Sequence, residues 1–209
     1  MNTFRSLITA LILALFLASP VSAAPPPPPS TPLLVPPIKT EGNNKDVRRA
    51  YYRIGKTEVK ATIAQMGGQQ HFTLWEGKTN VFHFSAPTSK LFYGDMGAFT
   101  SGGQTFFYYY ANTRIGWRAP GAPPASGRGI VVGKSPVDGT YRIYVDSADY
   151  YHPNTDDFQL AIGLVQQREH ERFIALYFGP ELFSDFGGVT AQYALSYNPS
   201  TDSFVYEER

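Results

Sequence analysis

The stretch "TFFYYYAN", Thr105–Asn112, places five aromatic residues side by side. In a β-strand, alternate side chains point to opposite faces, so both faces of this strand would be aromatic. The pattern is typical of a central strand that is packed on both faces, with tyrosine hydroxyls reaching water or backbone. The alternatives are an exposed stacking platform on one face and an aromatic girdle around a membrane barrel. The girdle is disfavoured because membrane strands need ~9–11 residues, and most runs in this chain are shorter.

The rest of the chain repeats this short-strand pattern. Val59, Ala61 and Ile63 alternate in one run, Phe72 and Leu74 in the next, and Gly, Pro, Asn or Asp bound each run. About eleven or twelve such runs, rich in β-branched and aromatic residues, predict a mostly β fold. We expect an antiparallel β-sandwich or a closed β-barrel, with one or two short helices.

Three segments could be helical. Residues 44–55 carry apolar side chains at helical spacing and end at a glycine, and residues 179–188 resemble one helical turn that follows a proline. Residues 156–173 contain strong helix formers, but Leu160, Ile162 and Leu164 alternate as in a strand and Gly163 interrupts a helix. The short segment "QREHE" is a poor tight turn, so both structures stay open for this third segment.

The first residues indicate a secretory signal peptide over residues 1–23. Arg5 precedes the apolar run Leu7–Ala18, and "VSA" at Val21–Ala23 fits a small-residue cleavage pattern. The chain contains no cysteine, which suits a bacterial periplasm or exterior better than a disulfide-rich eukaryotic exterior. We therefore expect a secreted or periplasmic protein with no transmembrane segment after signal cleavage.

A proline-rich stretch follows the signal peptide. Residues 24–43 contain the run "APPPPPSTPLLVPP", whose prolines favour extended polyproline II structure. We interpret this stretch as a flexible tail or linker. Residues 44–209 are then a single β-rich domain, which is long enough to bury a core.

The two halves of the expected mature chain carry opposite charges. Residues 24–134 contain thirteen Lys and Arg against five Asp and Glu, a net charge of +8, and residues 135–209 contain four against twelve, a net charge of −8. Such asymmetry points either to a charged partner or to a fold in which early and late strands interleave and the charges cancel. We favour interleaving.

Few catalytic or metal-binding patterns are present. The chain lacks G-x-S-x-G, H-E-x-x-H, a phosphate-binding glycine loop and any thiol. If residues 70–76 and 80–85 form a hairpin, one register sets His71 opposite His83 as a metal pair. A second register pairs Phe72 with Phe84, which is more favourable, and separates the histidines. We therefore expect no metal site.

These observations favour a non-enzymatic binding module for a carbohydrate, a peptide or an anionic envelope polymer, with no nucleic-acid partner. We expect ligand contacts from five stacking residues and three anion-binding residues: Tyr108, Tyr110, Trp117, Tyr150, Tyr151, and Arg114, Arg118, Arg128. If the other face of strand 105–111 is exposed, Phe107 and Tyr109 take the stacking role.

Two alternative functions remain. A glycan-directed hydrolase would use the carboxylates of Asp149 and Asp156 near His152. A structural protein would self-associate through sheet edges. The loop Asp146–Asp157, which holds the candidate hydrolase residues, also offers oxygen ligands for calcium at Asp146, Asp149, Asp156 and Asp157. Their spacing differs from that of a calcium loop, so we expect no cofactor.

Overall fold

A computed structural model describes residues 33–42, 47–87, 93–112, 127–147, 159–168, 171–179 and 191–208. Within these residues the chain forms antiparallel β-sheets and contains no α-helix. No helix in the described part of the chain is long and apolar enough to cross a membrane. The expected mostly β class is confirmed.

The strands form three sheets. The N-terminal sheet has the order β2-β3-β4-β5-β6, with bounds Lys39–Glu41, Val47–Ile54, Thr57–Met66, Gln69–Glu76 and Thr79–Pro87. The central sheet has the order β1-β7-β8-β9-β10, with bounds Leu33–Val35, Tyr93–Ser101, Gln104–Asn112, Gly127–Lys134 and Tyr141–Asp146. The C-terminal sheet has the order β11-β12-β13-β14, with bounds Gln159–Arg168, Glu171–Gly179, Ala191–Asn198 and Ser203–Glu208.

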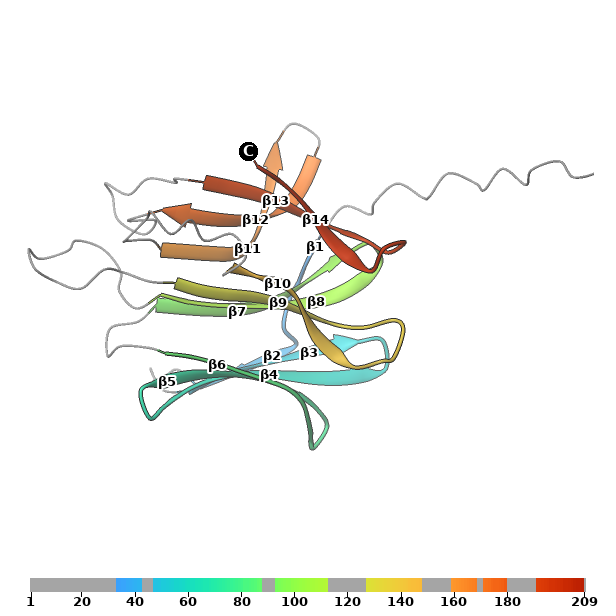
Figure 1. Ribbon diagram of the computed structural model, residues 1–209. Helices are drawn as coiled ribbons and strands as arrows, with labels where there is room; N and C mark the ends of the chain where they lie inside the picture. Colours follow the sequence, from blue (N-terminus) through green and yellow to red (C-terminus); the bar gives the residue numbers. More distant parts are fainter. Residues whose placement is uncertain are drawn as a thin grey trace, which may run out of the picture.

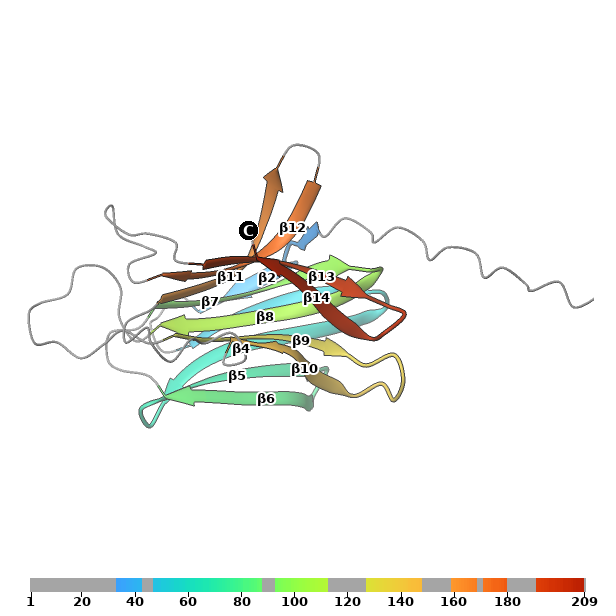
Figure 2. The ribbon, with the colours of Figure 1, turned by 45° about the horizontal axis from the view of Figure 1, so that its top comes forward.

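The central sheet lies between the other two, and the sheets are open rather than closed into a barrel (Figures 1 and 2). The aromatic strand β8 is the middle strand of this middle layer. Phe107 faces the N-terminal sheet, where its ring meets Tyr52 at 5.5 Å between centroids. Phe106 faces the C-terminal sheet and lies 4.8 Å from both Tyr197 and Phe204. The interpretation of this strand as a central one that is packed on both faces is confirmed.

Glycines on the neighbouring strands make room for these rings. Gly97 on β7 pairs with Tyr108, and Gly133 on β9 pairs with Phe106. A Cβ atom at either glycine would lie only 2.5 Å from the paired ring. The rings of Phe106 and Tyr108 therefore cover bare backbone, which explains how this strand accommodates large side chains on the face toward the C-terminal sheet.

Two expectations from the sequence are wrong. Residues 47–54 form strand β3 rather than a helix, because they pair along their whole length with β4. The ordered domain also begins before residue 44. Strand β1 pairs with β7, and strand β2 pairs with β3, so part of the proline-rich stretch crosses from the central sheet to the N-terminal sheet.

Residues 159–168 and 171–179 form two paired strands, and their register shifts between Ile162 and Leu164, at the glycine that interrupted the helical pattern. The alternating pattern was thus the correct guide for this segment. The helical turn expected in residues 179–188 lies almost entirely outside the described residues.

Within the described residues, the strands of the basic half and of the acidic half lie mostly in different sheets. All strands of the N-terminal sheet come from the basic half, and all strands of the C-terminal sheet come from the acidic half. Among the described residues, positions 39–87 contain seven Lys and Arg against three Asp and Glu, a net charge of +4. Positions 159–208 contain two against four, a net charge of −2. The expected cancellation by interleaving is wrong, because only the central sheet mixes early and late strands.

Candidate functional site

The expected stacking residues of β8 are core residues. Tyr108 and Tyr110 are only 9% and 5% exposed, and the alternates Phe107 and Tyr109 are still more deeply buried. None of these four rings offers an open face on which a ligand could stack. This corrects the expectation of a stacking surface on β8, although Tyr108 also borders a cavity that is described below.

Arg128, which was expected to bind an anion, binds instead to Asp146, one of the oxygen donors of the calcium alternative. The Arg128 Nη2 atom lies 2.6 Å from Asp146 Oδ2, and the guanidinium also lies over the Phe84 ring at 5.8 Å. Each group thereby partly neutralises the other. The remaining expected residues lie outside the described part of the chain: Trp117, Tyr150, Tyr151, Arg114, Arg118, Asp149, Asp156, Asp157 and His152.

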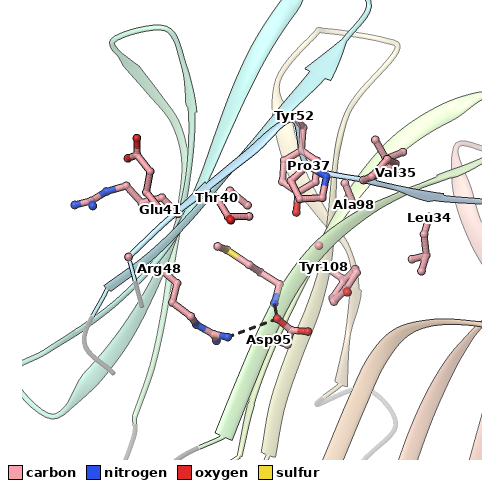
Figure 3. A pocket seen from close by; sticks show the side chains of 16 residues that line it. Leu34, Val35, Pro37, Thr40, Glu41, Arg48, Tyr52, Asp95, Ala98 and Tyr108 are labelled. Carbon is pink, nitrogen blue, oxygen red and sulfur yellow. Dashed lines mark hydrogen bonds and ion pairs between the residues drawn. The ribbon is translucent and has the colours of Figure 1, made fainter. Parts of the chain in front are cut away.

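A cavity of about 520 Å³ opens between the edges of the central and N-terminal sheets (Figure 3). One wall is the segment Leu34–Gly42, which links β1 to β2, and the facing walls are formed by β3, β7 and Tyr108 of β8. Leu34, Tyr52 and Met96 are among its apolar lining residues. This volume and this lining are typical of sites that take a small molecule or a peptide side chain.

The polar groups of the cavity converge from two sheets. Arg48 on β3 lies 3.7 Å from Asp95 on β7 and also donates a hydrogen bond to the Gly94 carbonyl. The backbone N–H of Met96 donates to Asp95 Oδ1 at 2.8 Å and thus fixes the carboxylate. Burial, and to a smaller extent the charge of Asp95, raises the pKa of Tyr52 to about 12, so its hydroxyl stays protonated at neutral pH.

The mouth of the cavity is mildly basic. Glu41 accepts a hydrogen bond from Tyr51 Oη at 2.9 Å and forms an ion pair with Lys39 Nζ at 2.5 Å. The hydrogen bond from Lys39, followed by that from Tyr51, lowers the pKa of Glu41. Arg49 also lines the cavity and stands directly opposite Glu41 on the neighbouring strand. Both Lys39 and Arg49 act on Glu41, and together they carry one more positive charge than it can neutralise. This surplus positive charge at the mouth favours an anionic ligand.

The outer face of the N-terminal sheet continues from this mouth. Tyr51, Lys60 and Trp75 are direct neighbours on β3, β4 and β5, and together they form a row that we call the outer aromatic row. The Lys60 ammonium lies 4.8 Å from the Trp75 ring, and the Lys39 ammonium lies 5.5 Å from the Tyr51 ring. Exposed cation–π contacts contribute only about 0.5–1 kcal/mol, so an anionic ligand can draw the lysines away and uncover the rings.

The described lining of the cavity holds no histidine, serine or cysteine. Its two carboxylates are each already bound to a cation. Sequence reasoning missed this site because its walls come from segments far apart in the chain. Trp75 could have been found, because placing Phe72 and Leu74 inward turns it outward.

The two histidines of the β5–β6 hairpin meet in spite of the expected register. The structure confirms the pairs Phe72–Phe84 and Leu74–Phe82. His71 and His83 are then diagonal neighbours on one face, and their Nδ1 and Nε2 atoms lie 3.0 Å apart. The expectation that this register separates the histidines is wrong, because diagonal side chains on adjacent strands are still within reach of each other.

Comparison with known proteins gives this chain no family: no protein-family model, no curated protein and no solved structure matches it.

Proposed function

We propose that the protein is a secreted, non-enzymatic binding module, and that the cavity between the sheets holds a peptide with an acidic group. The observation that carries this proposal is the combination of apolar walls with the surplus positive charge at the mouth. The apolar walls suit a peptide side chain, and a guanidinium binds a carboxylate through two parallel hydrogen bonds. The apolar run and cleavage pattern within residues 5–23 support secretion.

Binding is tested with a peptide array that is probed with the mature chain. Secretion is tested by N-terminal sequencing of the secreted product, which is expected to begin at Ala24. Leu34→Asp places a charge on the apolar wall, and Arg49→Glu reverses the charge at the mouth. Each variant is expected to weaken acidic peptides at least about tenfold, the equivalent of 1.4 kcal/mol. Arrays that show no peptide binding contradict the proposal.

Two matched controls separate the cavity from general surface effects. Val137→Asp adds the same charge at an apolar side chain that is 84% exposed and outside the cavity. Arg53→Glu reverses a charge on the same strand and the same face as Arg49, where the side chain is 59% exposed. Both controls should keep the affinity of the parent chain. Equal weakening by the controls would show that the interaction is only long-range electrostatic attraction.

A second candidate ligand is an acidic polysaccharide on the outer aromatic row. The row favours it because two ring-bearing residues flank a lysine across three strands, and neighbouring strands lie ~5 Å apart. A glycan array probed in parallel decides between the two ligands. Binding of acidic glycans that is lost with Trp75→Ala and kept with Leu34→Asp would favour the outer aromatic row over the cavity.

A further inference from the structure

His71 and His83 form a side-chain cluster that the proposed function does not use. They project from β5 and β6 on the solvent-exposed face of the N-terminal sheet. Their rings are nearly parallel, at an interplanar angle of 15°, and their centroids are 5.3 Å apart. One ring nitrogen can donate a hydrogen bond to the other, so a nitrogen of each imidazole lies close to a nitrogen of its neighbour.

We propose that His71 and His83 chelate a divalent transition-metal ion of the Cu²⁺, Ni²⁺ and Zn²⁺ group. Metal–nitrogen bonds of about 2.0–2.1 Å place neighbouring ligand nitrogens ~2.9–3.4 Å apart. The observed separation of 3.0 Å lies inside this range. Rotation of the rings about their Cβ–Cγ bonds lets both lone pairs converge on an ion beside the pair, and imidazole nitrogens suit these three metals.

The surroundings of the pair are compatible with a cation. The direct cross-strand neighbours of the histidines are Ala64 and Ser85 for His71 and Thr73 for His83, and none of them is charged. The β5–β6 hairpin is paired along both strands, so the two ligands are largely positioned before the ion arrives. No group of three or more metal-binding side chains occurs in the described residues. Water therefore fills the remaining positions, and the site is open to an added ligand.

Calorimetric titration of the untagged mature chain with Zn²⁺ tests the proposal, with an expected stoichiometry of one ion per chain. His71→Asn and His83→Gln keep an amide near the Nδ1 and Nε2 positions, respectively, while removing the imidazole. Each is expected to weaken Zn²⁺ binding at least about tenfold, because one of only two protein ligands is lost. The midpoint of unfolding, measured alongside, checks that the fold is intact.

The other two histidines of the chain supply the matched controls. His152→Asn and His170→Gln make the same chemical changes elsewhere and should leave the affinity unchanged. Electron paramagnetic resonance with Cu²⁺ gives an independent readout, with two coordinated imidazole nitrogens expected in the parent chain and one in each of His71→Asn and His83→Gln. Loss of binding in the control variants, or one ion shared between two chains, would overturn an open site on a single chain.

Discussion

At the scale of single residues, one buried polar pair marks the interface between the N-terminal and central sheets. Gln70 is fully buried, and its Oε1 atom accepts a hydrogen bond of 2.8 Å from the Tyr109 hydroxyl. Burial raises the pKa of Tyr109, so the hydroxyl keeps the proton that it donates. The Gln70 Nε2 atom has no hydrogen-bond partner in the structure. The pair therefore already carries the cost of one unsatisfied amide group.

Removing the hydroxyl should expose this imbalance. Tyr109→Phe leaves both polar ends of Gln70 unsatisfied, so we expect the free energy of unfolding to fall by about 1–3 kcal/mol. Adding Gln70→Leu removes the stranded amide and should restore most of the lost stability. Urea unfolding of both variants measures the effect. A Tyr109→Phe variant as stable as the parent chain would contradict this account of the interface.

Individual residues of the β5–β6 hairpin also show which contacts could be predicted from the sequence. The favourable pair Phe72–Phe84 was enough to predict the register of the β5–β6 hairpin as far as Leu74, but not the shift between Leu74 and Trp75. The contact between His71 and His83 was not predicted, because it depends on side-chain direction across a diagonal rather than on the register itself. Pairing rules thus predicted most of the strand pairing in this hairpin and missed the histidine contact that this pairing creates.

At the scale of elements, the turn between β13 and β14 is fastened to the central sheet. Asp202 in this turn has a φ of 47°, a conformation that is uncommon for a residue other than glycine. Its Oδ1 atom accepts hydrogen bonds of 2.7 Å from Tyr144 on β10 and from Tyr197 on β13. Arg142 on β10 lies 2.5 Å from Oδ2. These contacts hold an outer sheet to the central one at a single carboxylate.

The fastening should depend on pH. Burial tends to raise the pKa of the Asp202 carboxyl, but hydrogen bonds from Tyr144 and Tyr197 and the charge of Arg142 lower it below its ordinary value of 3.8. A lowered folded-state pKa stabilises the fold above the ordinary value, and this stability is lost as the pH falls through the folded-state pKa. Asp202→Asn should therefore destabilise the protein at neutral pH and have little further effect in strong acid.

The control for this prediction is Asp138→Asn in the turn between β9 and β10. The Asp138 carboxylate accepts hydrogen bonds from the N–H of Thr140 at 2.9 Å and from the Thr140 hydroxyl at 2.8 Å. Its other hydrogen bonds also lie within the turn between β9 and β10, so within the described residues it is not bonded to another sheet. Unfolding of both variants at neutral pH and below pH 3.8 makes the comparison. Equal losses at neutral pH would show that Asp202 acts only within its own turn.

The elements that sequence analysis misjudged share a physical cause. In β3, Val47, Ala50, Tyr51 and Ile54 fit a helical period, yet Ala50, Tyr52 and Ile54 also alternate as in a strand. Pairing with β4 decides between the two, and no local pattern shows it. Strand β1 is only three residues long and lies between prolines, so its existence depends on contact with distant β7. The cavity that this crossing segment builds was invisible for the same reason.

At the scale of the whole molecule, the segment 33–42 ties two sheets together. It donates β1 to the central sheet and β2 to the N-terminal sheet, and it forms one wall of the cavity (Figure 3). Val35 packs against the core from this segment. Removal of the segment 33–42 would expose the edge of β3 and the edge of β7.

Two truncated chains test this role. A chain that begins at Asn44 should lose ~2 kcal/mol of unfolding free energy or more, about the value of one fully buried aliphatic side chain. A chain that begins at Leu33 retains both short strands and serves as the control. The shorter chain should also lose any ligand of the cavity. Equal unfolding midpoints for the two chains would show that the segment 33–42 does not stabilise the fold.

The arrangement of the N-terminal sheet has a consequence for the growing chain. Its five strands follow one another in sequence, and turns of two residues join the last four, so they can pair before the rest of the protein exists. The inner face that carries Tyr52, Phe72 and Leu74 then stays exposed to solvent until β7, β8 and β9 cover it. A nascent chain whose first 87 residues have left the ribosome would therefore expose this apolar face, and we expect a holdase chaperone to bind it at that stage of synthesis.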